Sequence, residues 1–227
     1  MNIIKNNEVK LHYIEQKNND SNQWVLFIPG AVVSAEQVGK ELHNAKFNYY
    51  ILSLRGRGQS DSPKVGYSLH NQASDIECFI NQVDSNIDLT IFAHSIGVPI
   101  SIIALSNIER KINAYIMCEF APFYPPFDKN WSDGIKKQKI DSISNVAVDG
   151  IVKDAKYIDV VEELKSINTK VHLLVGDNQF SALRDKEKGA LQKLLPNLNI
   201  KSIKGGHELL EENNIQTLAF IDSVLNH

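Results

Sequence analysis

The sequence contains the segment Leu89-Thr90-Ile91-Phe92-Ala93-His94-Ser95-Ile96-Gly97, in which an apolar, partly β-branched run leads into a single serine. Ala93 stands two residues before Ser95, where glycine is usual, and Gly97 stands two residues after it. An apolar helical stretch, residues 98–105, follows at once. A strand, a tight turn and a helix in this order are typical of a nucleophile elbow, which holds a serine in a strained backbone conformation between small residues. Taken by itself, the segment also fits a buried βα turn with a capping serine.

The composition is that of an ordinary globular protein. Of the 227 residues, 43% are hydrophobic and 22% are charged, and the formal net charge is −3. This length favours one domain with a single sizeable core, so we expect residues 1–227 to form one unit. The basic residues are scattered rather than clustered, so we predict no nucleic-acid partner.

The two cysteines, Cys78 and Cys118, lack the spacing of metal ligands. We expect both to be reduced residues of the core, in agreement with a cytoplasmic location. Residues 1–15 show no basic segment followed by an apolar one, and no apolar run approaches the length of a membrane span. We therefore predict no membrane partner, and we also predict no metal and no cofactor.

Strand-like apolar runs alternate with amphipathic stretches along most of the chain. This alternation predicts an α/β fold with a mainly parallel sheet of about eight strands and helices on both faces. The expected strands are residues 2–4, 9–15, 24–28, 49–54, 90–92, 114–118, 171–175 and 200–203, and the expected helices are residues 36–47, 69–83, 98–105, 181–195 and 215–225.

One segment, residues 121–168, interrupts this alternation between two core strands. It opens with three prolines and mixes aromatic with charged residues. We interpret it as a short lid insertion of one to three helices, because lids at the carboxyl edge of a sheet commonly shape a substrate pocket. Its aromatic side chains either line that pocket or only pack the lid onto the core, and both readings stay open for Phe120, Phe123, Tyr124, Phe127 and Trp131.

Chemically versatile side chains follow the ends of several predicted strands. Ser95 ends one strand, Glu119 and Asp177 follow two others, and His207 follows the last one after two glycines. Ligands of an open α/β sheet bind beyond the carboxyl ends of its strands. The sequence therefore predicts that a serine, a histidine and carboxylates meet at one edge of the sheet.

With these features the chain resembles the α/β-hydrolase superfamily over roughly residues 9–225. Residues 55–63, Arg-Gly-Arg-Gly-Gln-Ser-Asp-Ser-Pro, resemble the family's RGxGxSxxP loop, in which Arg55 and Arg57 are expected to anchor the loop. Ser95 matches the family's nucleophile and His207 its catalytic histidine. The resemblance implies the α/β-hydrolase fold and a serine hydrolase with a catalytic triad and an oxyanion hole.

The roles of these residues follow from their chemistry. A serine hydroxyl is a weak nucleophile, so a base must take its proton during attack, and the imidazole of His207 suits this role. The developing oxyanion needs two fixed N–H donors, which the resemblance assigns to the backbones of Ala31 and Ile96. His94, next to Ser95, is expected to face the opposite side of the turn and to pack or form a hydrogen bond.

The acid of the triad is the open question. Most relatives carry it three residues after the glycine that ends the seventh strand, and this position holds Gln179. Glu119 is our first candidate, because a carboxylate at the end of a buried strand is costly unless it is paired, and because its place resembles the acid site of some haloalkane dehalogenases. Asp177 is the alternative acid. A lid-anchoring salt bridge at Glu119, or a site without a catalytic acid, also fits.

Two classes of function fit these observations. The first is a carboxylesterase-like serine hydrolase that cleaves a small, fairly apolar ester, thioester or related acyl substrate through an acyl-enzyme on Ser95. The second is a hydrolase-fold protein that binds a ligand for signalling, with slow or no turnover. A C–C hydrolase or an acyltransferase without a cofactor is a further alternative. The expected partner is a small acyl substrate, and the sequence predicts no oligomeric state.

Overall fold

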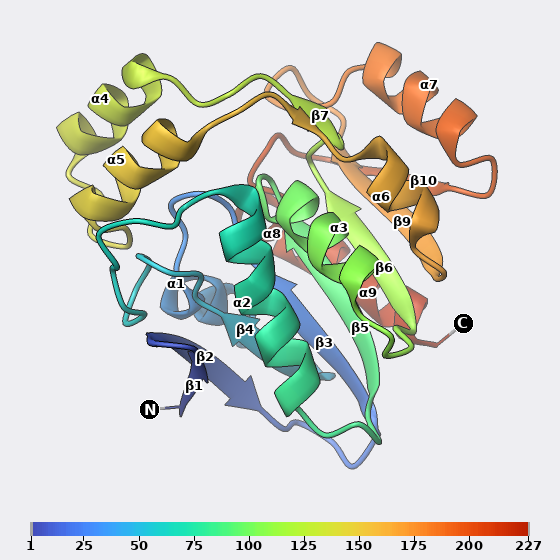
Figure 1. Cartoon of the computed structure of the whole chain (residues 1–227). Coiled ribbons are helices and arrows are strands. Elements are labelled where there is room, and N and C mark those ends of the chain that lie inside the picture. The colour runs from blue at the N-terminus through green and yellow to red at the C-terminus, as the bar shows by residue number, and fades with distance from the viewer. Residues whose placement is uncertain (1, 227) are drawn as a thin grey trace.

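An eight-stranded sheet forms the centre of the molecule in the computed structural model, which describes residues 2–226 (Figure 1). The pairs β1–β2 and β2–β4 are antiparallel and the other neighbouring pairs are parallel. This confirms the predicted mainly parallel sheet. The strands lie in the order β1 (Asn2–Asn6), β2 (Val9–Gln16), β4 (Asn48–Leu52), β3 (Gln23–Ile28), β5 (Asp88–His94), β6 (Ala114–Cys118), β9 (Lys170–Gly176) and β10 (Asn199–Ile203).

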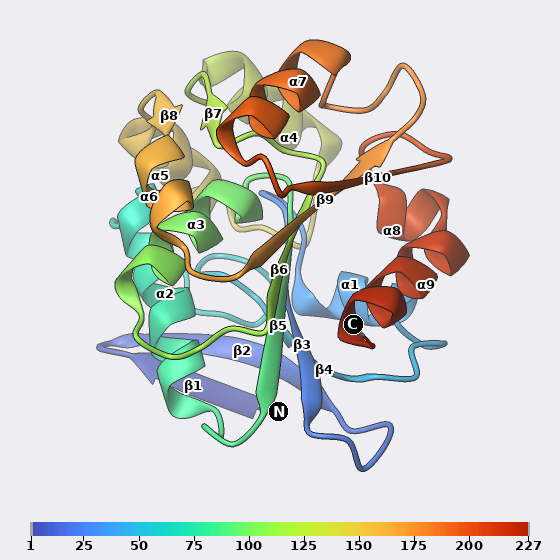
Figure 2. The ribbon, with the colours of Figure 1, turned by 90° about the vertical axis from the view of Figure 1, so that its right-hand side faces the viewer.

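Helices cover both faces of this sheet (Figure 2). On one face lie α1 (Ala35–Glu41), α8 (Leu209–Glu212) and α9 (Asn214–Leu225), and on the other lie α2 (Leu69–Gln82), α3 (Gly97–Asn107) and α6 (Val161–Ser166). Successive side chains of a strand point to opposite faces. In β5, Ile91 accordingly joins the apolar cluster on one face and Phe92 joins the cluster on the other. Both faces are covered, which is why this strand is a continuous apolar run rather than an alternating one.

The segment between β6 and β9 lies over the carboxyl ends of the strands (Figure 1). It contains β7 (Phe123–Tyr124), α4 (Lys129–Gln138), α5 (Asn145–Asp154), β8 (Ile158–Asp159) and α6, and β7 pairs with β8 in an antiparallel ribbon. Residues of α5 form a small apolar cluster with Tyr67, whereas Leu164 of α6 joins the main core. The predicted lid thus contains three short helices, and its last helix packs on the sheet.

Two predicted helices differ from the structure by several residues at one end, whereas the other three differ by one or two residues. The helix expected over residues 36–47 ends at Glu41, and the chain continues in a turn in which the amide of Ala45 donates to the carbonyl of Leu42 at 2.9 Å. Leu42 and Ala45 are still buried, so apolar spacing suited to a helix is here satisfied by a turn. The helix expected over residues 181–195 begins only at Asp185, as α7 (Asp185–Leu194).

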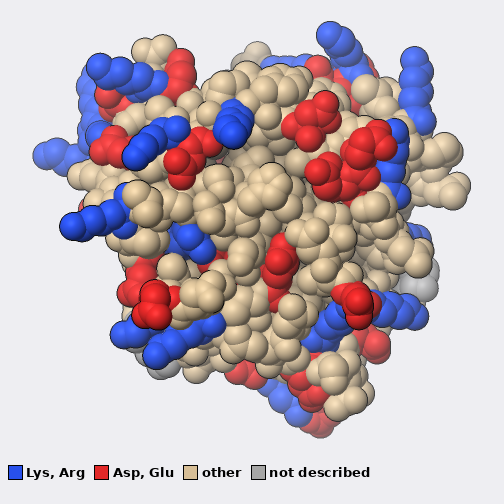
Figure 3. Space-filling view, in the orientation of Figure 1, with Lys and Arg blue, Asp and Glu red and all other residues tan. Residues whose placement is uncertain are grey.

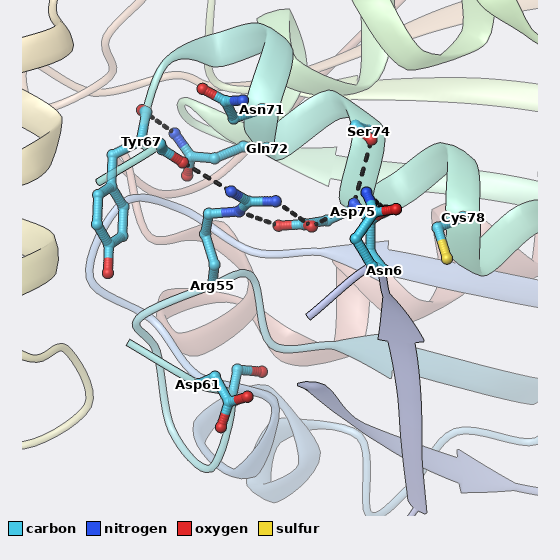
Figure 4. A network of polar contacts seen from close by, with 12 residues as sticks. Asn6, Arg55, Asp61, Tyr67, Asn71, Gln72, Ser74, Asp75 and Cys78 are labelled. Atoms are coloured by element: carbon cyan, nitrogen blue, oxygen red, sulfur yellow. Dashed lines mark hydrogen bonds and ion pairs between the residues drawn. The ribbon is translucent and has the colours of Figure 1, made fainter. Parts of the chain in front are cut away.

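A buried ion pair holds the loop after β4 (Figure 4). The guanidinium of Arg55 donates two hydrogen bonds of 2.6 Å to the carboxylate of Asp75 in α2, and the side-chain amide of Asn6 donates to the same carboxylate at 2.8 Å. Buried charges persist when they are paired and hydrogen-bonded in this way. Arg55 therefore anchors its loop, as predicted.

The surface carries charged side chains of both signs. Lys and Arg side chains are interspersed with Asp and Glu on the face shown in Figure 3. Within residues 2–226, no helix combines the length and the apolar character that crossing a membrane requires.

The two cysteines differ in burial. Cys118 is buried in the core as expected, but Cys78 is only half-buried, with its sulfur 3.1 Å from the carbonyl oxygen of Lys5 at the edge of the sheet.

Candidate active site

Ser95 occupies a strained turn between β5 and α3. Its φ is +54°, a conformation that non-glycine residues rarely adopt. A Cβ atom on Gly97 would lie 2.6 Å from the carbonyl oxygen of Ile28, so glycine alone fits there. Ala93 is fully buried between β3 and β6, where it lies opposite Ile28 and Met117. The close carbonyl explains the glycine at position 97, and the burial of Ala93 between two strands suits a small residue.

The imidazole of His207 lies against this serine. Its Nε2 atom is 3.1 Å from the Ser95 Oγ atom, within hydrogen-bond distance. His207 belongs to the loop after β10, which is held by two carboxylates: Glu212 accepts from the amide of Gly206 at 2.7 Å, and Asp177 accepts from the amide of Gly205 at 3.2 Å. The histidine predicted from the sequence therefore meets the predicted nucleophile.

Glu119 lies on the other side of the imidazole. Its side chain is fully buried, and its Oε2 atom is 3.6 Å from the Nδ1 atom of His207. The carboxylate accepts hydrogen bonds from the amide of Gly176 at 2.6 Å, the hydroxyl of Ser181 at 2.9 Å and the amide of Ala182 at 2.7 Å. The φ of Glu119 is +58°, so a second strained residue points its side chain into the site.

The electrostatics keep Glu119 ionised. Burial by itself raises the pKa of this carboxyl, because the charged form loses its hydration. The neighbouring imidazole of His207 and the hydrogen bonds from the two backbone amides and Ser181 together lower the pKa more than burial raises it. The net pKa lies below the ordinary value, so Glu119 is a carboxylate at neutral pH and can stabilise a protonated imidazole.

The loop after β9 takes a different part. Asp177 and Gln179 are both exposed, and the carboxylate of Asp177 accepts from the amide of Gly205. The backbone carbonyl of Gln179 accepts from the guanidinium of Arg184 at 2.5 Å. Within the described chain, neither side chain forms a hydrogen bond or an ion pair with the imidazole of His207. Of the two candidate acids, the structure brings Glu119 to the histidine, whereas Asp177 supports the loop that carries it.

His94 forms a hydrogen bond, as expected, but its orientation differs from the prediction, because it lies beside His207 rather than on the opposite side of the turn. Its Nε2–H donates to the carbonyl oxygen of His207 at 2.8 Å, and the two ring centroids are 4.8 Å apart. Burial lowers the pKa of His94 by more than Glu208 and the accepting carbonyl raise it, so its ring is neutral at neutral pH. Its place directly before Ser95 is the only sequence signal for this contact, since the partner is 113 residues away.

The two predicted oxyanion donors lie at the ends of β3 and β5. Within residues 2–226, the N–H groups of Ala31 and Ile96 have no protein acceptor. Ile96 caps the N-terminus of α3, where the helix dipole favours negative charge. The buried guanidinium of Arg57 donates to the carbonyl of Ala31 at 2.8 Å, and a Cβ atom on Gly30 would lie 3.2 Å from that of Ser95. The segment that follows β3 therefore approaches Ser95 closely and is held there.

A cavity of about 360 Å³ adjoins Ser95 and His207. Its walls include Ala31, Val32 and Val33 from the loop after β3. Four of the five aromatic residues singled out in the sequence line it, namely Phe120, Tyr124, Phe127 and Trp131. The fifth, Phe123, lines a neighbouring cavity. These side chains therefore form the pocket wall rather than only packing the lid.

One group of side chains has the spacing of a metal site. His94, His207 and Glu208 present ligand atoms within 4.8 Å of one another. The Nε2 atoms of both histidines already face partners, the carbonyl of His207 and the hydroxyl of Ser95. A cation bound through these atoms would have to displace both contacts, so the arrangement suits acid–base chemistry better than metal binding.

No protein-family model and no curated protein matches this sequence. Solved structures do match it. An α/β hydrolase enzyme from a Medee basin deep-sea metagenome library has a TM-score of 0.81 at 16% identity, over 100% of this chain and 98% of that one. An esterase from Exiguobacterium antarcticum has a TM-score of 0.80 at 17% identity, over 96% of both chains. The enol-lactonase from Burkholderia xenovorans has a TM-score of 0.79 at 12% identity, over 100% of both chains.

These likenesses extend over nearly the whole length of each chain, while the identities are low. Similarity of this kind establishes architecture, and function has to be argued from the site. The chain has the α/β-hydrolase fold.

Proposed function

We propose that this protein is a serine hydrolase that cleaves a small, fairly apolar ester or thioester through an acyl-enzyme on Ser95. The observation that carries the proposal is the 3.1 Å contact between the Ser95 Oγ and His207 Nε2 atoms, with the buried Glu119 carboxylate behind the imidazole. A serine is activated by a base that takes its proton and by a third group that orients this base. Ser95, His207 and Glu119 are placed in this order.

In the first half of the reaction, Ser95 Oγ attacks the substrate carbonyl carbon while its proton moves to His207 Nε2. The carbonyl π electrons become the oxyanion, which the N–H groups of Ala31 and Ile96 stabilise. The negative charge of Glu119 stabilises the imidazolium that forms. The tetrahedral intermediate then collapses: the bond to the leaving group breaks, and His207 gives its proton to the departing alcohol or thiol.

In the second half, water attacks the acyl carbon and gives a proton to His207 Nε2. The second tetrahedral intermediate uses the same two N–H donors. When it collapses, the bond to Ser95 Oγ breaks, the proton returns from His207 to the serine, and the carboxylic acid leaves. The net reaction consumes one ester and one water and needs no oxidant or reductant.

The fold neighbours support an acyl substrate. By name they include esterases and an enol-lactonase, and each of these terms denotes hydrolysis of an ester bond. The apolar and aromatic walls of the cavity support a substrate with a fairly apolar body. The cavity volume of about 360 Å³ favours a small one.

Hydrolysis of p-nitrophenyl acetate and p-nitrophenyl butyrate tests this proposal. We expect multiple turnovers by the wild-type protein and a loss of at least about 10³-fold in Ser95→Ala, as is typical when a nucleophile is removed. Ser62→Ala, which alters an exposed serine in the loop after β4, is the matched control and should keep full activity. Equal rates for wild type and Ser95→Ala would refute the proposal.

The ligand-binding alternative rests on one observation. The 3.6 Å between His207 Nδ1 and Glu119 Oε2 exceeds hydrogen-bond length, and this nitrogen is buried without a partner among the described residues. A site that stays in this geometry would bind an ester without turning it over quickly. Saturable thermal stabilisation by the same esters, with no release of p-nitrophenol, would favour that alternative.

A further inference from the structure

We propose that the preferred substrate carries a cationic ammonium group, and that Glu208 and the aromatic wall of the cavity select it over neutral and anionic esters. The inference rests on the proposed hydrolase function and concerns the class of substrate. Two independent features of the cavity support it: a continuous row of aromatic rings and the charge of the remaining lining side chains.

The aromatic row runs from the end of β6 into the lid. Phe120 and Tyr124 have ring centroids 4.7 Å apart, Tyr124 and Phe127 are 6.2 Å apart, and Phe127 stacks on Trp131 at 4.6 Å. All four rings line the cavity beside Ser95. Aromatic faces attract cations through their quadrupole, most strongly in sites from which water is excluded.

Glu208 provides the negative charge. It directly follows His207 and lines the same cavity, whose lining contains no Lys or Arg among the described residues. The nearest basic atom to its carboxylate is His94 Nε2 at 3.9 Å, and the ring of His94 is neutral because burial lowers its pKa. The adjoining cavity shares Phe120 and Tyr124 and has Glu187 as its charged lining residue.

These features act in the same direction on a charged substrate. The carboxylates of Glu208 and the buried Glu119 attract a cation and repel an anion, and the aromatic row adds to the attraction. The side chain of Glu208 is half exposed, so solvent weakens the electric field of its carboxylate. We therefore expect a preference of about 3- to 10-fold for each unit of substrate charge, rather than an absolute discrimination.

Three butyrate esters of similar shape isolate the effect of charge. Butyrylcholine carries a trimethylammonium group, 3,3-dimethylbutyl butyrate is its neutral counterpart, and butyryl isethionate carries a sulfonate. We expect kcat/KM to fall in this order, by about 3- to 10-fold at each step at low ionic strength. Added 0.5 M NaCl should reduce both ratios, because salt screens a half-exposed carboxylate.

Variants assign the preference to Glu208. Glu208→Gln should lower the cation-to-anion ratio severalfold and leave the part that the aromatic row contributes, and Glu208→Lys should lower the ratio further. Glu211→Gln is the matched control, because this neighbouring exposed glutamate lies outside the lining of the cavity. The rate with uncharged p-nitrophenyl butyrate, measured in every variant, shows that each folds and retains its catalytic groups.

The outcomes separate this inference from the proposed function. Equal kcat/KM values for the three esters, or a preference for butyryl isethionate, would overturn the inference while leaving the hydrolase intact. A preference that persists unchanged in Glu208→Gln would overturn the role of Glu208. No hydrolysis of any of the three esters, nor of the p-nitrophenyl esters, would instead count against the proposed function.

Discussion

The ends of β6 and β9 both carry a carboxylate next to the candidate active site, and they use it differently. Glu119, after β6, is fully buried, adopts a positive φ and faces the imidazole of His207. Asp177, after β9, is exposed and accepts a hydrogen bond from the backbone of the loop that carries His207. One carboxylate is placed to act on the histidine, and the other is placed to support its loop.

This difference shows how the site can have a carboxylate beside His207 although position 179 is a glutamine. The β9 loop contributes donors instead: the amides of Gly176 and Ala182 and the hydroxyl of Ser181 all bind the carboxylate that arrives from β6. Three such hydrogen bonds offset the cost of burying the charge. The two strand ends therefore act together, with β6 supplying the charge and β9 its hydrogen-bond donors.

Glu119→Gln tests the difference most strongly. The substitution keeps the shape but removes the charge that stabilises imidazolium, so we expect kcat for p-nitrophenyl butyrate to fall by about 10³- to 10⁴-fold. Asp177→Asn is the matched control, and its kcat should stay within about threefold of wild type, because an amide oxygen can still accept from Gly205. The reverse pattern would move the acid to β9.

Strand β9 also carries a buried histidine that makes the stability of the fold depend on pH. His172 of β9 lies opposite Ile116 of β6, and burial lowers its pKa to about 4. Between pH 6.5 and 4 the unfolded chain binds a proton that the folded chain excludes, so the stability present above pH 6.5 is lost as the pH falls.

Because of His172, we expect the free energy of unfolding of the wild-type protein to fall by about 3 kcal/mol between pH 6.5 and pH 4. The His172→Phe variant should not show this loss. Urea unfolding of both proteins from pH 7 to pH 4 measures the difference. If the two stability curves run parallel with pH, the buried neutral histidine does not have this effect. The experiment also shows below which pH an activity profile reports unfolding rather than catalysis.

Ser181→Ala tests the contribution of β9 to the carboxylate. The variant removes one hydrogen bond of 2.9 Å to Glu119. The loss should lower kcat by about tenfold, the effect of about 1.4 kcal/mol. It should also raise the pKa of Glu119, so the acid limb of the kcat profile should move to higher pH. An unchanged acid limb would separate Ser181 from the ionisation of this carboxyl.

His94 provides the smallest expected effect. Phenylalanine at this position cannot donate to the His207 carbonyl, so we expect His94→Phe to lower kcat about five- to tenfold with little change in KM. His94→Gln retains a donor and should recover part of the loss. If both variants behave like wild type, the 2.8 Å contact does not position the histidine.

Most of the fold follows from local patterns in the sequence. The alternation of apolar runs with amphipathic stretches predicts the mainly parallel sheet with helices on both faces, and the strand ends indicate where Ser95, His207 and Glu119 lie. The ends of the helices are harder to predict from the sequence, because tertiary contacts decide where a helix begins and ends. Ser181 and Ala182 bind Glu119, which is 62 and 63 residues away, and α7 begins only after them, at Asp185.

The contact between His94 and His207 was missed for the same physical reason. The sequence shows that His94 directly precedes Ser95, but the direction of its side chain depends on a loop 113 residues away. The ambiguity between Glu119 and Asp177 was of this kind as well. Burial cost favours a paired Glu119, yet only the folded chain shows that its partners come from the β9 loop and the His207 loop.

Labelling with a fluorophosphonate tests the central claim, that His207 and Glu119 activate Ser95, most directly. The measurement is the rate of covalent modification of wild type, Glu119→Gln and Asp177→Asn, with the modified peptide mapped by mass spectrometry. We predict one adduct, on Ser95, formed at similar rates in wild type and Asp177→Asn and at least about 100-fold more slowly in Glu119→Gln. No adduct on Ser95 in wild type, or equal rates in all three proteins, would contradict the account.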